Sequence, residues 1–174
     1  MPKALVDFDG GLLVDRATGV LAEAGCDPVL AVLGAAEDEV RARAALDGVR
    51  VVSNPEWPTG MGSSVRVALR SLADTEAEAA LVLPVDMPGI TAEAAARVAA
   101  LAGPSALAAA AHGGRRSHPV LLGREHWAGV IESAHGDAGA RDYLKPRTVT
   151  TVSCDDISDG FDVDRPEDLE RTGT

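Results

Sequence analysis

Three aspartates follow or alternate with apolar residues in two short segments of the chain. Asp86 closes the run in L-V-L-P-V-D-M-P-G (residues 81–89), and Asp162 and Asp164 alternate in F-D-V-D-R-P-E-D-L (residues 161–169). Ligands of open α/β sheets bind beyond the carboxyl ends of the strands. Alternating residues of an extended segment point to the same side, so one of the two later aspartates can face Asp86. Carboxylates from two such ends suit Mg²⁺, which takes few protein oxygens and keeps water and phosphate ligands.

Each of these aspartates also has a purely structural interpretation. Asp86 could cap the helix predicted from residue 92, although Thr91 is better placed to do so. Asp164 could cap a last helix with Pro166 in its first turn.

A glycine-rich loop, T-G-M-G-S-S (residues 59–64), lies between a predicted strand and a predicted helix. Glycines allow a backbone to approach a ligand closely, and the start of a helix offers free N–H groups to an anion or a base edge. The alternative is an ordinary turn with a serine cap, and the loop alone does not decide between the two.

Two further segments carry polar groups suited to an anionic ligand. His118 follows Arg115 and Arg116 at the boundary between a loop and a strand, and could contact a phosphate or serve a structural role. The segment G-D-A-G-A-R (residues 136–141) combines glycines with Arg141, which suits an anion, or it could be a helix capped by Asp137.

The elements around these residues alternate between strand and helix, which predicts an α/β fold with a parallel sheet and helices on both faces. Pro84 would then lie at the last paired position of its strand. Residues 2–8 are predicted as extended, followed by a turn at Asp9-Gly10-Gly11. Further strands are predicted at 28–33, 49–52, 81–85 (within the stretch 81–89, which Pro88 and Gly89 end), 106–110, 119–122 and 148–152, with a short extended piece at 161–163. Helices are predicted at 12–24, 35–46, 65–72, 92–101, 124–133, 138–144 and 166–171.

Length and composition narrow the class of protein. The 174 residues suit a single domain, spanning 1–174, whose core must be built mainly from Ala, Val and Leu because only 3% of residues are aromatic. A net charge of −11 argues against a nucleic-acid binder. Cys26 and Cys154 lack metal-site spacing and are expected to be reduced thiols. With no leader or apolar span in the sequence, we expect a cytoplasmic protein with no membrane segment.

Five segments, taken together and in order, resemble the molybdenum cofactor cytidylyltransferases of the MobA-like NTP transferase family. They are N-P-E-W-P-T-G-M-G-S-S, L-P-V-D-M-P, H-P-V-L-L-G-R, G-D-A-G-A-R and D-V-D-R-P-E-D-L. The resemblance implies a Rossmann-like, three-layer nucleotidyltransferase fold with a mostly parallel central sheet. It also implies Mg²⁺-dependent transfer of a nucleoside monophosphate, most naturally CMP from CTP, to a phosphorylated acceptor such as molybdopterin, with release of pyrophosphate.

The same resemblance assigns roles to individual residues. Lys3 matches a catalytic lysine that contacts the triphosphate, and Asp86 and Asp164 match the carboxylates that hold the metal. The remaining matches fall in two groups: nucleotide-binding Gly60, Met61, Gly62, Ser63 and Ser64, and acceptor-binding His118, Gly136, Asp137, Gly139 and Arg141.

One departure concerns the start of the chain. The family pattern places a strand and a loop of the form L-A-A-G-x-S-x-R-M-G just before the lysine, whereas Lys3 here follows Met1 and Pro2 directly. Such a loop supplies backbone donors to a triphosphate. We therefore expect residues 1–174 to bind CTP more weakly, and to be less stable, than a chain extended upstream, whether the start is internal or a real truncation.

The sequence is also compatible with two other functions. The segment A-L-V-D-F-D-G-G-L-L-V-D (residues 4–15) resembles the opening of haloacid-dehalogenase-type phosphatases, with Asp7 as nucleophile and Asp9 as acid/base. The chain could also be a non-catalytic nucleotide-binding or regulatory domain. Mg²⁺-dependent release of pyrophosphate from CTP separates the first function from this last one.

Overall fold

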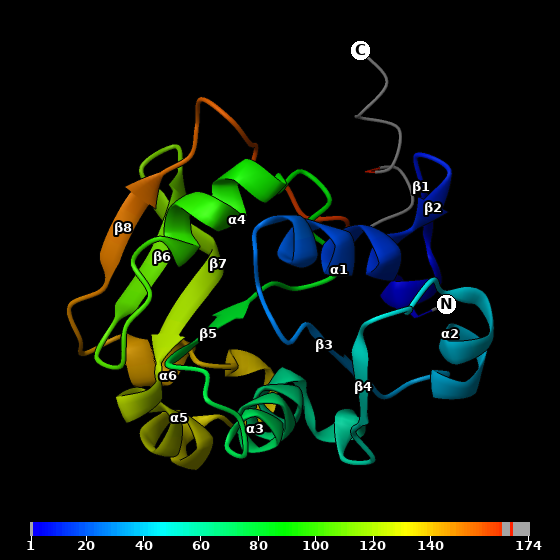
Figure 1. Ribbon diagram of the computed structural model, residues 1–174, viewed down its shortest axis with the longest axis horizontal. Coiled ribbons are helices and arrows are strands. Elements are labelled where there is room, and N and C mark those ends of the chain that lie inside the picture. Colours follow the sequence, from blue (N-terminus) through cyan, green and yellow to red (C-terminus); the bar gives the residue numbers. More distant parts are fainter. Residues whose placement is uncertain (1, 165–167, 169–174) are drawn as a thin grey trace.

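The computed structural model describes residues 2–164 and residue 168. The chain alternates between strands and helices over most of its length (Figure 1). In chain order the elements are η1 (Lys3–Leu5), β1 (Asp7–Phe8), β2 (Gly11–Leu12), α1 (Leu13–Glu23), β3 (Leu30–Leu33), α2 (Glu37–Arg43), β4 (Arg50–Ser53), η2 (Trp57–Thr59), α3 (Met61–Leu72), β5 (Ala79–Val82), α4 (Ala92–Ala99), β6 (Leu107–His112), β7 (Arg115–Gly123), η3 (Arg124–His126), α5 (Trp127–Ser133), η4 (Gly136–Ala138), α6 (Arg141–Leu144) and β8 (Thr150–Ser153).

The larger sheet has four strands in the order β5-β7-β6-β8. β6 and β8 are parallel, and β7 runs antiparallel to both of its neighbours, so β5, β6 and β8 share one direction. β3 and β4 form a separate parallel pair. The predicted α/β fold is confirmed, and the sheet is mixed because β6 and β7 form a hairpin rather than a crossover.

Helices cover the strands from two sides, giving three layers (Figure 1). On one side, α4 packs on β6 and β7 around a buried cluster that includes Ile90, Val98 and Leu121. On the other side, α3 and α5 enclose a cluster that includes Leu69, Leu122 and Trp127. The low aromatic content is thus offset by close packing of Ala, Val and Leu on both faces of the sheet.

The first residues differ from the extended segment predicted for 2–8. Lys3–Leu5 form one turn of 3₁₀ helix, and Asp7–Phe8 pair with Gly11–Leu12 in a two-residue antiparallel hairpin. The predicted turn at Asp9 and Gly10 is confirmed, with φ of +50° and +82°. These left-handed conformations suit a tight hairpin turn. The 3₁₀ turn before Val6 limits the extended piece to Asp7–Phe8.

Several other boundaries differ from those predicted. β5 ends at Val82, so Pro84 lies in the following loop, and residues 161–163 form no strand. β7 begins at Arg115 because Gly113 and Gly114 make the hairpin turn with positive φ. The last predicted helix, 166–171, falls outside the described residues except for Asp168.

A cleft of about 1100 Å³ separates the two sheets, and every residue of β3 and β5 lines it. Within residues 2–164, β3 pairs only with β4, and β5 only with β7, so each has one edge without a strand partner. Much of the lining is apolar. Strand edges expose backbone donors and acceptors, so this cleft offers both apolar surface and hydrogen-bonding groups.

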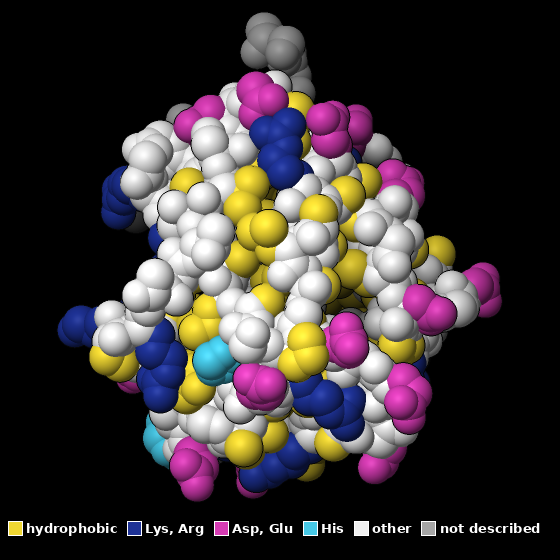
Figure 2. Space-filling model, turned by 60° about the vertical axis from the view of Figure 1, so that its left-hand side comes forward, with side chains coloured by type: hydrophobic (Ala, Val, Ile, Leu, Met, Phe, Trp, Pro, Cys, Tyr) yellow, Lys and Arg dark blue, Asp and Glu magenta, His cyan; other side chains and the backbone are white. Residues whose placement is uncertain are grey.

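Charged side chains lie mainly around the rim of the face drawn in Figure 2, with hydrophobic side chains in its hollowed middle.

No helix within the described part of the chain is long and apolar enough to cross a membrane.

Candidate nucleotide and metal site

Lys3 joins the two aspartates that the sequence singled out. Its Nζ donates to Asp86 Oδ2 at 2.7 Å and to Asp164 Oδ1 at 2.9 Å. The side chain of Asp86 is the least exposed of the three, at 21%, against 42% for Lys3 and 67% for Asp164. Three residues far apart in sequence thus form one cluster, with two carboxylates sharing one cation.

Backbone contacts bring the three segments together. Asp86 lies in the loop that follows β5, four residues beyond its last paired residue, Val82. The N–H of Val163 donates to the backbone carbonyl of Asp86 at 2.8 Å, and the Val163 side chain is buried. Leu5, buried at the end of η1, anchors the turn that carries Lys3. Each charged group therefore projects from a buried backbone anchor.

The electrostatics of Lys3 combine two opposing effects. Burial disfavours the charged ammonium, but hydrogen bonds and Coulomb attraction from Asp86 and Asp164 outweigh it, so the pKa of Lys3 is raised above its ordinary value. Lys3 is therefore a full cation at neutral pH.

The glycine-rich loop packs against the second small-residue segment. A Cβ on Gly60 would lie 2.5 Å from the carbonyl carbon of Gly136, and one on Gly62 would lie 2.7 Å from that of Ala134. Gly60 also has a φ of +107°. These glycines thus serve a close approach between two backbones, in addition to any role toward a ligand. The predicted nucleotide and acceptor segments lie side by side.

Asn54, for which no role was predicted, holds this loop through side-chain hydrogen bonds. Its side chain is buried, and its amide donates to Ser63 Oγ at 2.8 Å and to Ser64 Oγ at 3.0 Å, while its carbonyl oxygen accepts from Glu56 N–H. Ser63 is itself buried and donates to the Gly60 carbonyl. The predicted binding residue Ser63 is therefore used within the loop. The sequence signal for Asn54 was its place at the start of the family-like segment N-P-E-W-P-T-G-M-G-S-S.

Arg66 makes a second connection between the glycine-rich loop region and the residues that precede the segment 136–141. The guanidinium of Arg66 on α3 donates to the carbonyl of Ala134 and forms an ion pair with Glu56 at 3.1 Å. Arg66 thus links η2, α3 and the end of α5.

His118 lies on β7, just past the part that pairs with β5. The pairing of β5 with β7 ends at Val82 and Val120, and beyond that point both His118 and Asp86 line the large cleft. Burial lowers the pKa of His118, and the charge of Asp86 opposes this only in part. His118 is therefore neutral at pH 7 and can contact a phosphate by a hydrogen bond but not as a cation.

The cleft between β3 and β5 collects most of the predicted site residues. Its lining includes Lys3, Met61, Ser64, Asp86, His118, Asp137, Gly139 and Arg141. Gly60, Gly62, Ser63, Gly136 and Asp164 lie outside that lining. Asp162 lines the cleft, whereas Asp164 contacts Lys3, so both alternating aspartates face the region of Asp86.

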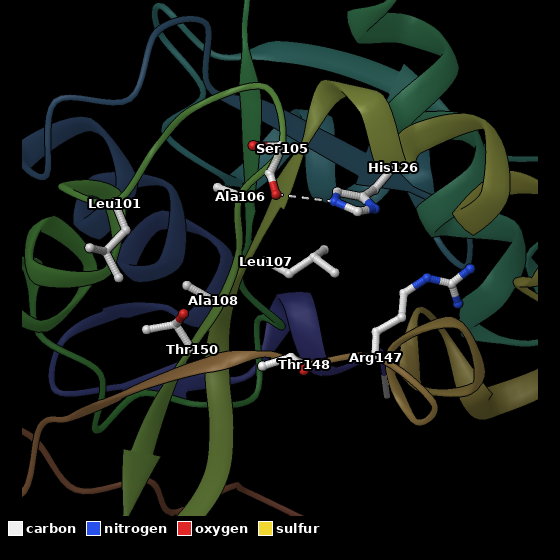
Figure 3. Close-up of a pocket in the computed structure, with 9 residues that line it drawn as sticks. All are labelled: Leu101, Ser105, Ala106, Leu107, Ala108, His126, Arg147, Thr148 and Thr150. Carbon is white, nitrogen blue, oxygen red and sulfur yellow. Dashed lines mark hydrogen bonds between the residues drawn. The ribbon is translucent and has the colours of Figure 1, made fainter.

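A smaller cavity of about 530 Å³ lies at the start of β6 and β8 (Figure 3). His126 and Arg147 border it, but the groups they carry are already engaged. His126 contacts Tyr143 Oη and the Ser105 carbonyl, and Arg147 stacks on the Tyr143 ring and donates to its carbonyl. None of the predicted site residues lines this cavity.

The phosphatase alternative would need Asp7 at the carboxyl end of a central strand. Asp7 instead lies exposed on the β1–β2 hairpin, and neither Asp7 nor Asp9 lines the large cleft. The geometry does not support that alternative.

Among the described residues, no group of three or more His, Cys, Asp or Glu side chains is arranged to hold a metal. The two carboxylates around Lys3 are hard oxygen donors that share the Lys3 ammonium. A donor set of this kind fits an ion that also takes water and phosphate ligands.

The three-layer α/β architecture, with polar groups gathered beyond strand ends at one cleft, is that of a Rossmann-like nucleotidyltransferase. The sequence profile of the MobA-like NTP transferase domain matches residues 1–152, and the chain belongs to this family. The predicted resemblance is therefore confirmed. A nucleotidyltransferase of this family is an enzyme that uses a nucleoside triphosphate and a phosphorylated acceptor.

One sequence relative and two solved structures are similar to the chain. The chain is 37% identical over 179 residues to a protein of Paenarthrobacter nicotinovorans named nicotine blue oxidoreductase, covering 98% of this chain and 87% of the relative. It is 26% identical to Rv0371c of Mycobacterium tuberculosis, solved in complex with manganese, with a TM-score of 0.80 and coverage of 98% and 90%. A nucleotidyl transferase from Methanothermobacter, at 20% identity, 0.74 TM-score and coverage of 96% and 77%, shares the fold.

Proposed function

We propose that the chain binds a nucleoside triphosphate in the cleft between β3 and β5 and transfers the nucleoside monophosphate to a phosphorylated acceptor. CTP is the favoured donor and a molybdopterin-like compound the favoured acceptor, as the motif resemblance implies. The observation that carries the proposal is the Lys3–Asp86–Asp164 cluster beside a cleft lined by the two small-residue segments.

Asp86 and Asp164 would hold the divalent cation, proposed as Mg²⁺. When bound, such an ion neutralises phosphate charge and orients the triphosphate. The manganese complex of Rv0371c is in keeping with a divalent ion.

The protein's own groups account for the rest of the reaction. An acceptor phosphate oxygen attacks the α-phosphorus, and pyrophosphate leaves from the opposite side. Such transfers depend on positioning and charge stabilisation more than on covalent catalysis. Lys3 supplies a positive charge at the triphosphate side. The loop held by Asn54 orients the nucleoside, and neutral His118 and the Arg141 cation orient the acceptor.

The test is a screen for pyrophosphate release with each common NTP, Mg²⁺ and molybdopterin acceptor. We expect release with CTP in the wild type and its loss in Asp86→Ala, whose fold is retained because Asp86 contacts Val163 through its backbone carbonyl. Asp47→Ala, which removes an exposed aspartate away from the cleft, is the matched control and should be unaffected. Unchanged turnover in Asp86→Ala would remove Asp86 from the mechanism.

One observation favours a second function, a redox reaction. The 37%-identical relative carries the name nicotine blue oxidoreductase. A cleft that accepts a triphosphate could also accept the pyrophosphate of a nicotinamide dinucleotide. Binding of NADH without binding of CTP, together with NADH-dependent bleaching of nicotine blue, would favour this function. CTP binding with no response to NADH would exclude it.

A further inference from the structure

We propose that Lys3 occupies the cation position of the site in the metal-free protein and must leave it when a divalent ion binds. Lys3 and the metal then compete for the same two carboxylates. This inference rests on the proposed metal site and deepens it, because it states what controls access to that site.

The distances indicate that Lys3 and a metal ion would occupy the same position between the two carboxylates, rather than adjacent positions. One nitrogen lies within 2.9 Å of an oxygen from each aspartate. Mg²⁺ holds its oxygen ligands at about 2.0–2.1 Å. An ion bound by both oxygens would therefore lie in the space that Nζ fills, and the ammonium and the metal cannot occupy it together. The charges agree, because two carboxylates and one ammonium leave a net negative charge.

The side chain of Lys3 can also change position while its backbone stays in place. Its side chain is 42% exposed and flexible, whereas the turn that carries it is fixed by buried Leu5 and by the Val6 N–H to Lys3 carbonyl hydrogen bond at 3.1 Å. Ion pairs of exposed lysines are weak. The ammonium can thus swing away while the backbone stays in place.

The displaced ammonium remains in the cleft, which Lys3 lines together with Asp86. There it can meet a triphosphate. Metal binding would release a cation for the nucleotide, and the nucleotide would hold that cation away from the carboxylates. Because such coupling is reciprocal, metal and nucleotide should bind cooperatively.

The test measures Mn²⁺ affinity by electron paramagnetic resonance, with and without CTP. Lys3→Met should bind Mn²⁺ alone about three- to tenfold more tightly than the wild type, since exposed ion pairs are weak and 1.4 kcal/mol is tenfold. The same variant should lose most of the Mn²⁺–CTP cooperativity. Lys145→Met makes the same charge change at an exposed lysine outside the cleft and should match the wild type. Lys3→Arg keeps the cation and should keep low Mn²⁺ affinity.

Two results would overturn the inference, and only the second would also reject the proposed metal site. Equal or weaker Mn²⁺ binding by Lys3→Met, beside clear binding by the wild type, rejects competition but leaves the metal site standing. Absence of Mn²⁺ binding in the wild type and in every variant rejects the metal site of the proposed function and this inference with it. Asp86→Ala should abolish Mn²⁺ binding in both the wild-type and the Lys3→Met background.

Discussion

The buried side-chain amide of Asn54 donates to the hydroxyl of Ser63 across 2.8 Å and ties the end of β4 to the first turn of α3. The same amide reaches Ser64, and the Asn54 carbonyl oxygen accepts from Glu56. One side chain thus connects the segment that follows β4 to the serine end of the glycine-rich loop. These hydrogen bonds hold the loop in one conformation without a ligand.

Asn54→Ala should destabilise the protein by about 1–3 kcal/mol, because it removes three hydrogen bonds and leaves buried polar groups unpaired. Urea unfolding measures this loss. Ser64→Ala removes only one of these bonds and should cost less. Equal stability of Asn54→Ala and the wild type would show that the network does not hold the loop.

Gly62→Ala should also destabilise the fold, by roughly 1–3 kcal/mol as for other overpacked sites. Its new Cβ would meet the backbone of Ala134 and His135 at 2.7–2.8 Å, where no side-chain rotation can relieve the clash. Thermal unfolding measures the effect.

Gly19→Ala is the control for Gly62. Gly19 lies inside α1 with no atom within 4 Å of the added Cβ. Alanine should stabilise the helix there by about 0.5–1 kcal/mol. If both glycine variants behaved alike, close backbone packing would not explain Gly62.

Stability should fall as the pH drops from 7.5 to 5.5, in part because of His118. Its pKa is lowered in the folded state by burial, so the unfolded chain takes up a proton first as the pH falls through the ordinary histidine range. Where the unfolded state binds more protons, stability rises with pH. Urea unfolding at several pH values should show a smaller acid-side loss for His118→Gln than for the wild type.

His135→Gln is the control for this pH dependence, because His135 is exposed and lies outside the cleft lining. It should keep the wild-type slope of stability against pH. An unchanged slope in His118→Gln would mean that burial does not hold His118 neutral.

Arg141→Ala should raise the KM for the acceptor more than the KM for the NTP, because Arg141 is an exposed cation that lines the cleft at the end of the segment 136–141. His118→Ala should shift the two constants in the same sense. Arg70→Ala removes an exposed arginine outside the cleft and serves as control. A loss confined to NTP affinity would mean that the two halves of the site are reversed.

Much of the fold could be predicted from local patterns. The strand at Leu30–Leu33 and the helix at Ala92–Ala99 follow apolar periodicity, and the predicted Thr91 cap is confirmed by its bond from Ala94 N–H at 3.1 Å. The β6–β7 hairpin was missed because two glycines, predicted as part of a longer loop, make a tight turn. The 3₁₀ turn at Lys3–Leu5 was missed because a short apolar segment extends only where a partner strand is available.

The site was harder to predict from the residues alone. The contact between Lys3 and Asp86 joins positions 83 residues apart, which no local spacing can reveal. The family resemblance selected these residues, and the structure brings them together. Asn54 was missed because its role depends on burial against Ser63, a relation that appears only when β4 and α3 meet.

The most direct measurement of the central claim is anomalous scattering from crystals grown with Mn²⁺ and CTP. We predict one strong anomalous peak at coordination distance from both Asp86 and Asp164, with the triphosphate in the cleft between β3 and β5 and Lys3 turned toward a phosphate. A peak elsewhere, or bound CTP with Lys3 still between the two carboxylates and no metal there, would contradict the account.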